Sequence, residues 1–204
     1  GNVYLQIGQE HVIRVYNEDV VPITNGKVVY ASSATGNIKK VKLANNTSYD
    51  ESSRVVGVAT EDIPSGHFGY ITVTGLVHDM DTDGASMGGQ LAYLGTNGNI
   101  TSTPPTAPNT KVVIGIVVRP HVTEGILYVR IKVIPRLQDL SDVTGSLTTS
   151  GQFPSWDHSN SRFNFDKNIN DYVPIETLED SGNPTGFVDN DAITVTYSYT
   201  NRTI

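Results

Sequence analysis

The sequence predicts an all-β protein, and three features support that prediction. Apolar residues recur at every second position through most of the first 135 residues, which is the period of a strand with one buried face. Short groups of turn formers such as "TNG", "ATGN" and "IPSG" separate these runs. No window of a dozen residues keeps apolar side chains at the spacing of a buried helix face. We therefore expect an antiparallel barrel or sandwich, because helical crossovers have no sequence from which to form.

The predicted strands follow one another closely along the chain. Seven runs alternate in this way: residues 11–17, 26–32, 39–44, 54–60, 68–75, 90–95 and 111–118. An eighth run, "GILYVRIKVIP" at 125–135, separates its two faces most clearly. Its apolar face holds Leu127, Val129, Ile131 and Val133, and its other face holds Tyr128, Arg130 and Lys132. This regular spacing predicts meanders and hairpins.

The composition changes after residue 135 and divides the chain. Residues 1–135 form the β-module, the turn-rich residues 136–150 are predicted to be a linker, and residues 151–204 form a distal β segment. Two strands are expected in that segment, at 161–167 and 191–201. The chain breaks off in "YTNRTI", as a fragment of a longer protein would.

Two strands bury too little surface to be stable alone, so the distal segment is expected either to pack on the β-module or to be completed by other copies of the chain or another virion protein, with completion by oligomerisation favoured. The apolar residues expected in these contacts are Leu137, Leu140, Val143, Phe153, Trp156, Phe163, Phe165, Ile169, Tyr172, Val173 and Ile175, with Ile193, Val195, Tyr197 and Tyr199 on the last strand.

Composition excludes several classes of partner and chemistry. The net charge is −7, and no basic cluster is longer than Lys39–Lys40, so a nucleic-acid partner is not expected. No apolar stretch approaches the roughly 18 residues that cross a bilayer, so no membrane partner is expected either. The absence of cysteine excludes disulfides, thiol catalysis and cysteine zinc sites.

The acidic stretch "HDMDTDGASMGGQ" at 78–90 is a candidate cation site. Asp79, Asp81 and Asp83, followed by Gly84, match the opening of a calcium loop, but its twelfth position is Gln90 instead of a bidentate Glu. The favoured interpretation is a solvated turn whose carboxylates cap local amides. No cofactor is expected.

The same stretch contains a G-x-S-x-G pattern centred on Ser86. A nucleophile elbow needs a helix after the serine, whereas "MGGQLAYLG" has the pattern of a strand. The five histidines, His11, His67, His78, His121 and His158, lack ligand-like spacing. The scattered carboxylates also offer no recognisable acid–base pair. The sequence therefore predicts a protein that is not an enzyme.

The single tryptophan, Trp156 in "FPSWDHS", allows two interpretations. It is expected to anchor packing in a small β segment, and the alternative is a platform on which a sugar stacks.

The order of several motifs resembles a known family. "VVGVATEDI" at 55–63, "GYITVTGLV" at 69–77 and "GGQLAYLGTNGNITSTPP" at 88–105 are followed by the returning strand "VVIGIVV". This order resembles a β-module of tailed-bacteriophage structural proteins, especially tail fibres and related virion appendages. "LQDLSDVTG" at 137–145 and "GQFPSWDHSNSRFNFDKNI" at 151–169 are similar to segments that follow such modules. The resemblance implies a virion location, no catalytic residues, and a loop between two strands at "HDMDTDG".

The resemblance implies a function in assembly. We expect the virion-proximal part of a tail fibre or tail appendage that forms a homotrimer and contacts other virion proteins. One alternative is a capsid decoration (cement) or head-fibre protein. A second is a carbohydrate-binding adhesin that contacts host surface glycans through Trp156 and the tyrosines of the last strand, Tyr197 and Tyr199.

Overall fold

The computed structural model describes residues 10–82, 88–145 and 151–168. The chain divides into two compact units, residues 1–134 and residues 135–204. Among its described residues, the first unit contains a short helix, α1 (Tyr49–Ser53), and nine strands. These are β1 (Glu10–Asn17), β2 (Val28–Thr35), β3 (Ile38–Leu43), β4 (Val55–Ala59), β5 (Phe68–Met80), β6 (Leu91–Leu94), β7 (Ile100–Thr101), β8 (Val112–Arg119) and β9 (Gly125–Val133). The predicted all-β fold class is confirmed, and each of the eight predicted runs in this unit forms a strand.

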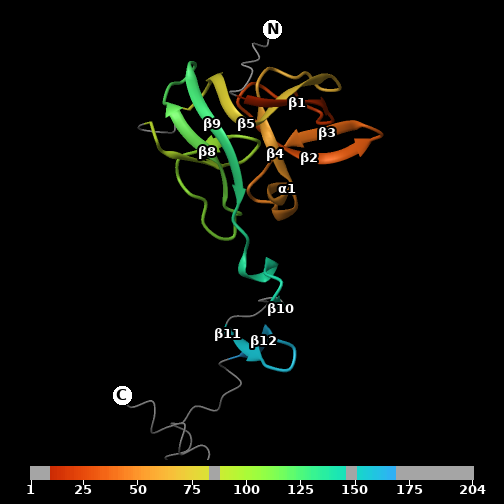
Figure 1. The fold of residues 1–204 in the computed structure, drawn as a ribbon, viewed down its shortest axis with the longest axis vertical. Coiled ribbons are helices and arrows are strands. Elements are labelled where there is room, and N and C mark those ends of the chain that lie inside the picture. The colour runs from red at the N-terminus through yellow and green to blue at the C-terminus, as the bar shows by residue number, and fades with distance from the viewer. Residues whose placement is uncertain (1–9, 83–87, 146–150, 169–204) are drawn as a thin grey trace, which may run out of the picture. The chain divides into compact units, whose positions relative to one another are not determined.

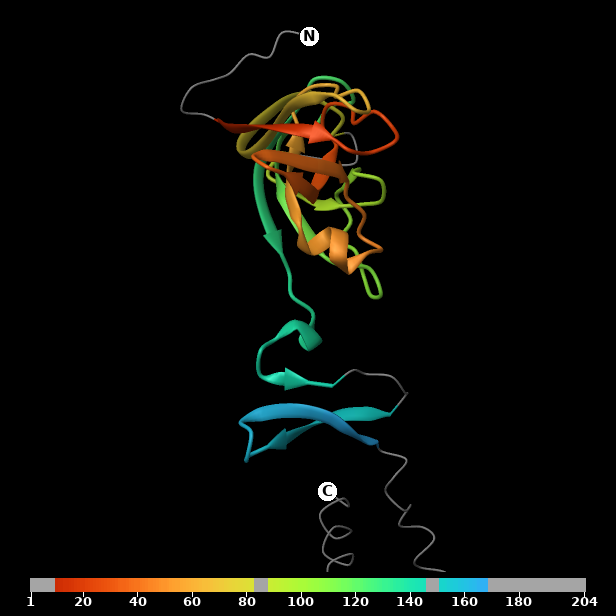
Figure 2. The same cartoon turned by 90° about the vertical axis from the view of Figure 1, so that its right-hand side faces the viewer.

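Five of these strands close into a small barrel. In the order β1, β3, β2, β4 and β5, each strand pairs with the next, and β5 pairs back with β1. All of these pairings are antiparallel except that of β1 with β3, which is parallel. Figure 2 shows α1 at one end of the barrel strands, next to the start of β4. A closed ring leaves no unpaired edge within the barrel.

The long strand β5 joins the barrel to a second sheet. Gly75 lies opposite Glu10 of β1 along one edge of β5 and opposite Val129 of β9 along the other. Beyond this point the sheet continues in the order β5, β9, β8, β6 and β7. Figure 1 shows β8 and β9 on one side of β5 and the barrel strands β2, β3 and β4 on the other.

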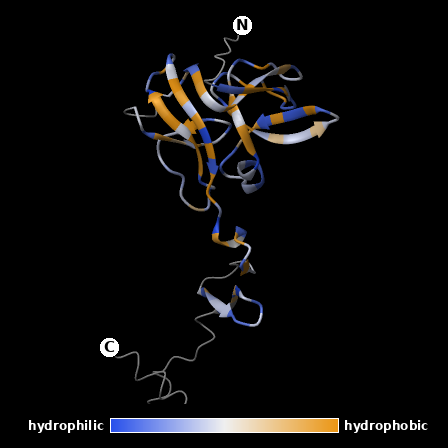
Figure 3. Ribbon diagram, in the orientation of Figure 1, coloured by the Kyte–Doolittle hydropathy of each residue, from blue (hydrophilic) through white to orange (hydrophobic). Residues whose placement is uncertain are grey.

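Alternate residues of the shared strands fill two separate cores. Val28 of β2 and Val58 of β4 pack with the second sheet, whereas their neighbours Val29 and Ala59 pack inside the barrel. All four side chains are fully buried. Figure 3 shows the corresponding alternation of apolar and polar residues along β9. Successive residues of β2 and β4 therefore point to opposite faces and fill different cores.

Two "TNG" turns approach each other where the barrel meets the second sheet. The Val28 N–H donates a hydrogen bond to the carbonyl of Gly98, and the Gly98 N–H donates to the carbonyl of Ala44. Gly98 has a φ of 70°, and a Cβ at this position would lie 2.8 Å from the Val28 carbonyl oxygen. Only glycine combines this left-handed backbone with so close an approach.

The strand β5 is longer than the sequence predicted. It continues to Met80, so His78, Asp79 and Met80 belong to a strand, and the expectation of a loop at this point is wrong. The pairing of β5 with β9 shifts register between Val77 and Met80, which is a bulge-like irregularity. Because of this break, the last residues of β5 do not follow the strict alternation from which the strand was predicted.

At residues 135–145 and 151–168, the second unit contains a three-stranded sheet and one turn of 3-10 helix, η1 (Leu137–Asp139). The sheet places β12 (Arg162–Asn168) between β10 (Val143–Thr144) and β11 (Gln152–Asp157). β12 corresponds to the strand predicted at 161–167, and β10 lies inside the segment expected to be a linker. The strand predicted at 191–201 lies outside the described residues. Within the described ranges, no helix is long and apolar enough to cross a membrane.

Candidate functional site

The acidic segment at the end of β5 projects two carboxylates outward. Met80 is 2% exposed and points into the core, whereas Asp79 and Asp81 on either side of it are exposed. Asp79 has a φ of 55°, a left-handed conformation that aspartate tolerates better than most residues. The side-chain amide of Asn25 donates to the carbonyl oxygens of His78 at 3.1 Å and Asp79 at 2.8 Å. This amide therefore fixes the backbone of the bulge.

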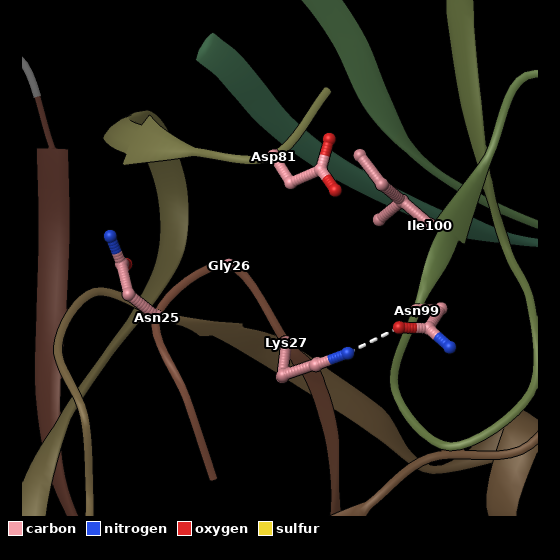
Figure 4. Close-up of a pocket in the computed structure, with 6 residues that line it drawn as sticks. All are labelled: Asn25, Gly26, Lys27, Asp81, Asn99 and Ile100. Carbon is pink, nitrogen blue, oxygen red and sulfur yellow. Dashed lines mark hydrogen bonds between the residues drawn. The ribbon is translucent and has the colours of Figure 1, made fainter. Parts of the chain in front are cut away.

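Asp81 also lines a polar pocket between the two "TNG" turns. The pocket has a volume of about 330 Å³. Its lining residues are Asn25, Gly26, Lys27, Asp81, Asn99 and Ile100. Figure 4 shows the Lys27 ammonium group donating to Oδ1 of Asn99, with the Asp81 carboxylate across the opening. An ammonium group, a carboxylate and amide groups can hold water or a small polar solute there.

The three aspartates of the candidate cation site are only partly described. Asp79 and Asp81 are placed as above, and Asp83 lies outside the described residues. Among the residues that are described, no three histidine or carboxylate side chains gather into a group that could hold a metal ion. The Lys27 ammonium group in the same pocket would also disfavour a cation electrostatically. The cation site therefore stays a prediction.

The surroundings of two histidines bear on the candidate catalytic residues. Ser86 lies outside the described residues. The Nδ1 atom of His121 accepts hydrogen bonds from the backbone N–H groups of Thr123 at 3.1 Å and Glu124 at 2.8 Å, so it stabilises a turn. The Nε2 atom of His78 is shielded from solvent and has no hydrogen-bond partner among the described residues.

The small sheet of the second unit has one aromatic face. Trp156 of β11 lies opposite Phe163 of β12, and Val143 of β10 lies opposite Phe163 on its other side. The rings of Trp156 and Phe163 meet edge to face, with centroids 5.0 Å apart. The opposite face carries Thr144, Ser155 and Asn164. The sheet is therefore amphipathic.

This aromatic face is open in the described structure. Trp156 is 52% exposed and Phe163 is 39% exposed, whereas Phe165 is 4% exposed. Trp156 packs against Phe163 on one side and is open on the other, so its expected role as a packing anchor stays a prediction. Leu137 and Leu140 are exposed as well. Of the fifteen apolar residues expected in contacts between copies, those from Ile169 onward lie outside the described residues.

Sequence reasoning did not find the polar pocket. The "TNG" turns at 24–26 and 96–98 were recognised as separators between strands. Their meeting depends on the pairing of strands far apart in the chain, which no local pattern specifies. One signal in the sequence points to these positions. The tripeptide "TNG" occurs twice, followed once by Lys27 and once by Asn99.

A match to a family of phage structural proteins defines the chain as a bacteriophage virion structural protein. Residues 7–133, more than half of the chain, match the family described as phage cement protein, and the chain belongs to that family. The virion location expected from the sequence is thereby confirmed. No curated protein matches the chain.

A comparison with solved structures gives a weaker likeness. The chain is similar to the head fiber gp8.5 N base of bacteriophage phi29, with 14% sequence identity and a TM-score of 0.38. The match covers 59% of this chain and 93% of the solved chain.

Proposed function

We propose that this protein is a capsid cement protein, which attaches to the outside of a phage head and holds neighbouring capsid subunits together. The observation that carries the proposal is the family match over residues 7–133, which coincides with the compact first unit of residues 1–134. The match favours capsid decoration, expected above as an alternative, over the tail fibre or tail appendage.

The construction of the first unit suits this function. Five strands close on themselves, and two buried cores share the strands β2 and β4. A domain held by two cores keeps its surface in one shape, which reduces the entropy lost on docking. A folded clamp that binds only the assembled capsid stabilises that assembly by mass action.

The role is structural in this proposal, without catalysis. Support comes from the chemistry of the chain, which has no cysteine, and from His121, whose Nδ1 atom is engaged by the backbone of its own turn. A nucleophile needs a base held beside it. A fluorophosphonate probe should leave the protein unlabelled, and stoichiometric labelling of Ser86 would contradict this.

The protein is further proposed to act as a homotrimer through its second unit. The open aromatic face with Trp156 and Phe163 supports self-association, because a small monomeric sheet would gain by covering it. Trimeric symmetry is an expectation from the sequence resemblance, and closed rings of identical subunits are common in such assemblies.

Carbohydrate binding is a second candidate function, supported by the exposure of Trp156. An indole ring that is 52% exposed can stack on the apolar face of a sugar ring. A glycan array with the wild type and Trp156→Ala tests this. Binding of defined glycans that the substitution abolishes supports an adhesin, whereas no binding on the array removes this candidate.

The main proposal is tested by finding the protein in the virion. Electron cryomicroscopy of the intact phage, compared with a mutant lacking the gene, should show density lost from the head surface. Heads without the protein should also release their DNA at a lower temperature than wild-type heads. Density lost from the tail or tail fibres, with unchanged heads, would overturn the cement proposal and favour the tail appendage.

A further inference from the structure

We propose that the outer face of the sheet formed by β5, β9, β8 and β6 is the surface through which this protein binds the capsid subunit. The proposal rests on the cement function and adds the residues and the chemistry of the contact. One row of apolar side chains that crosses all four strands carries it. This outer row consists of Leu76 of β5, Tyr128 of β9, Ile116 of β8 and Leu91 of β6.

The strand register places the four side chains in line. Leu76 lies opposite Tyr128, Tyr128 lies opposite Ile116, and Ile116 lies opposite Leu91. Residues directly opposite each other in antiparallel strands project from the same face of the sheet, with Cβ atoms about 5 Å apart. The outer row is therefore continuous across the sheet.

The core fixes which face the outer row occupies. The next residues along the same strands are Val77, Leu127, Val117 and Ala92, and all four belong to the buried core. Because successive side chains of a strand point to opposite faces, the outer row points away from that core.

The outer row is accessible to a partner in the described structure. Leu91 is 41% exposed and Tyr128 is 39% exposed, while Leu76 and Ile116 are half-buried. Val118, two residues beyond Ile116, is 50% exposed. An antiparallel sheet with one buried face normally carries polar residues on the other face. A contiguous apolar strip on that second face is the usual mark of a surface that binds another protein.

The charged residues that β9 places beside the outer row are both positive. Arg130 and Lys132 continue the outward-facing positions of β9 after Tyr128, and neither makes an ion pair with another described residue. No acidic residue occurs at 74–76, 91–93, 113–118 or 126–132, the segments nearest the outer row, and the first carboxylate beyond them on β5 is the exposed Asp79. The face is apolar with a cationic flank.

This charge pattern identifies the partner as a different protein. A second copy docking through the same face would bring Arg130 and Lys132 toward their own counterparts, which repel. A capsid surface with an apolar strip bordered by carboxylates would complement both the outer row and its flank. Tyrosine and arginine are also the residues that most often dominate binding at such contacts.

The test uses the full chain and heads purified from the phage that lacks the gene, with binding measured by co-sedimentation over a range of protein concentrations. Tyr128→Ser should weaken binding at least about tenfold, because a central tyrosine is lost from the contact. Tyr70→Ser is the matched control, since Tyr70 is 38% exposed on β5 at a position outside the outer row. It should bind as the wild type does.

A second pair of variants tests the charge. Arg130→Glu should weaken binding to heads, and the loss should be smaller at high salt, where the repulsion of carboxylates is screened. Lys39→Glu, which reverses an exposed charge on β3, should leave binding unchanged. Thermal melting of each free variant shows whether the substitution has left the fold intact.

The outcomes separate this proposal from the cement function. If Tyr128→Ser and Arg130→Glu both bind heads as tightly as the wild type does, the outer face is not the capsid contact. The cement function is unaffected by that result. If Tyr128→Ser changes the mass of the free protein and leaves head binding intact, the face joins copies of the chain, and the proposal is overturned. If the wild type itself does not bind heads, the cement function fails and this contact fails with it.

Discussion

Glu18 shows how one half-buried carboxylate can join segments that are separate in the sequence. Its Oε2 atom accepts hydrogen bonds from the hydroxyl groups of Ser32 at 2.9 Å and Ser33 at 2.8 Å, and its Oε1 atom lies 3.1 Å from Nζ of Lys40. The Ser33 hydroxyl, followed by Lys40 and Ser32, lowers the pKa of Glu18 from 4.5 to about 2. Glu18 therefore holds the end of β1 to the hairpin of β2 and β3.

This network predicts a pH-dependent contribution to stability. Because the pKa of Glu18 is lower in the folded protein, its carboxylate stabilises the fold above about pH 4.5, and that contribution is lost as the pH falls toward about 2. Glu18→Gln should lower the melting temperature at pH 7, and its difference from the wild type should shrink on acidification. The measurement is thermal unfolding between pH 7 and pH 2.

A matched control is Glu124→Gln, which removes an exposed ion pair with Arg119. Such surface pairs contribute little, so this variant should melt close to the wild type. A difference between Glu18→Gln and the wild type that stays constant over the whole pH range would contradict the assigned role. An NMR titration of the Glu18 carboxyl gives the pKa directly.

The sequence could not reveal this role. Glu18 appeared there as one of several scattered carboxylates, and its partners lie 14, 15 and 22 residues further along the chain. Only the pairing of β1 with β3, between Tyr16 and Lys40, brings them together. Parallel pairing of strands separated by a hairpin leaves no local pattern.

At Asp79 and Asp81, a chelator experiment tests the cation prediction. A bound ion at a hundred times its dissociation constant would contribute about 2.7 kcal/mol and raise the melting temperature by several degrees. We expect chelator to change the melting temperature little, because Lys27 shares the pocket with Asp81. A fall of several degrees that is absent in Asp81→Ala would establish a structural cation.

At the scale of elements, the pairing of β8 with β9 depends on Gly115. A Cβ at Gly115 would lie 2.0 Å from the carbonyl oxygen of Tyr128. The two backbones therefore approach each other more closely than any other residue would permit. The outer row passes through the next residue, Ile116, so this approach also sets the geometry of the proposed capsid contact.

Gly115→Ala should therefore destabilise the protein by about 3 kcal/mol, as expected for overpacking against backbone that cannot move aside. Urea unfolding measures the change. Gly36→Ala is the control, because no atom lies within 4 Å of a Cβ there, although its φ of 58° costs about 1 kcal/mol. Equal losses in the two variants would show that backbone conformation, and not the approach of β9, governs the effect.

The elements differ in how far sequence could predict them. β9 was predictable because its alternation is regular, and β8 because it is a run of β-branched residues, which are typical of strands. The end of β5 was not, because the bulge after Val77 interrupts the alternation. β11 was also missed, since Pro154 and polar residues occupy a strand whose pairing shifts register between Phe153 and Ser155.

At the scale of the whole molecule, charge is divided unevenly along the chain. Residues 135–204 hold ten of the 21 acidic residues but four of the 14 basic residues. Most of the net charge of −7 therefore belongs to the part of the chain that carries the aromatic face. Copies that associate through this part must bring like charges together, which opposes association at low ionic strength.

The last prediction concerns that association and its response to salt. Sedimentation velocity of the full chain over a concentration series should show a trimer, and Trp156→Ser should shift it toward the monomer because an indole ring leaves the contact. Val20→Ser, at an 89% exposed position in the first unit, is the control and should leave the mass unchanged. Raising the salt concentration should strengthen the trimer by screening the acidic segment, whereas it should weaken the binding of Arg130 to capsid carboxylates. A wild-type chain that stays monomeric at high micromolar concentration and high salt would show that the aromatic face is covered in some other way.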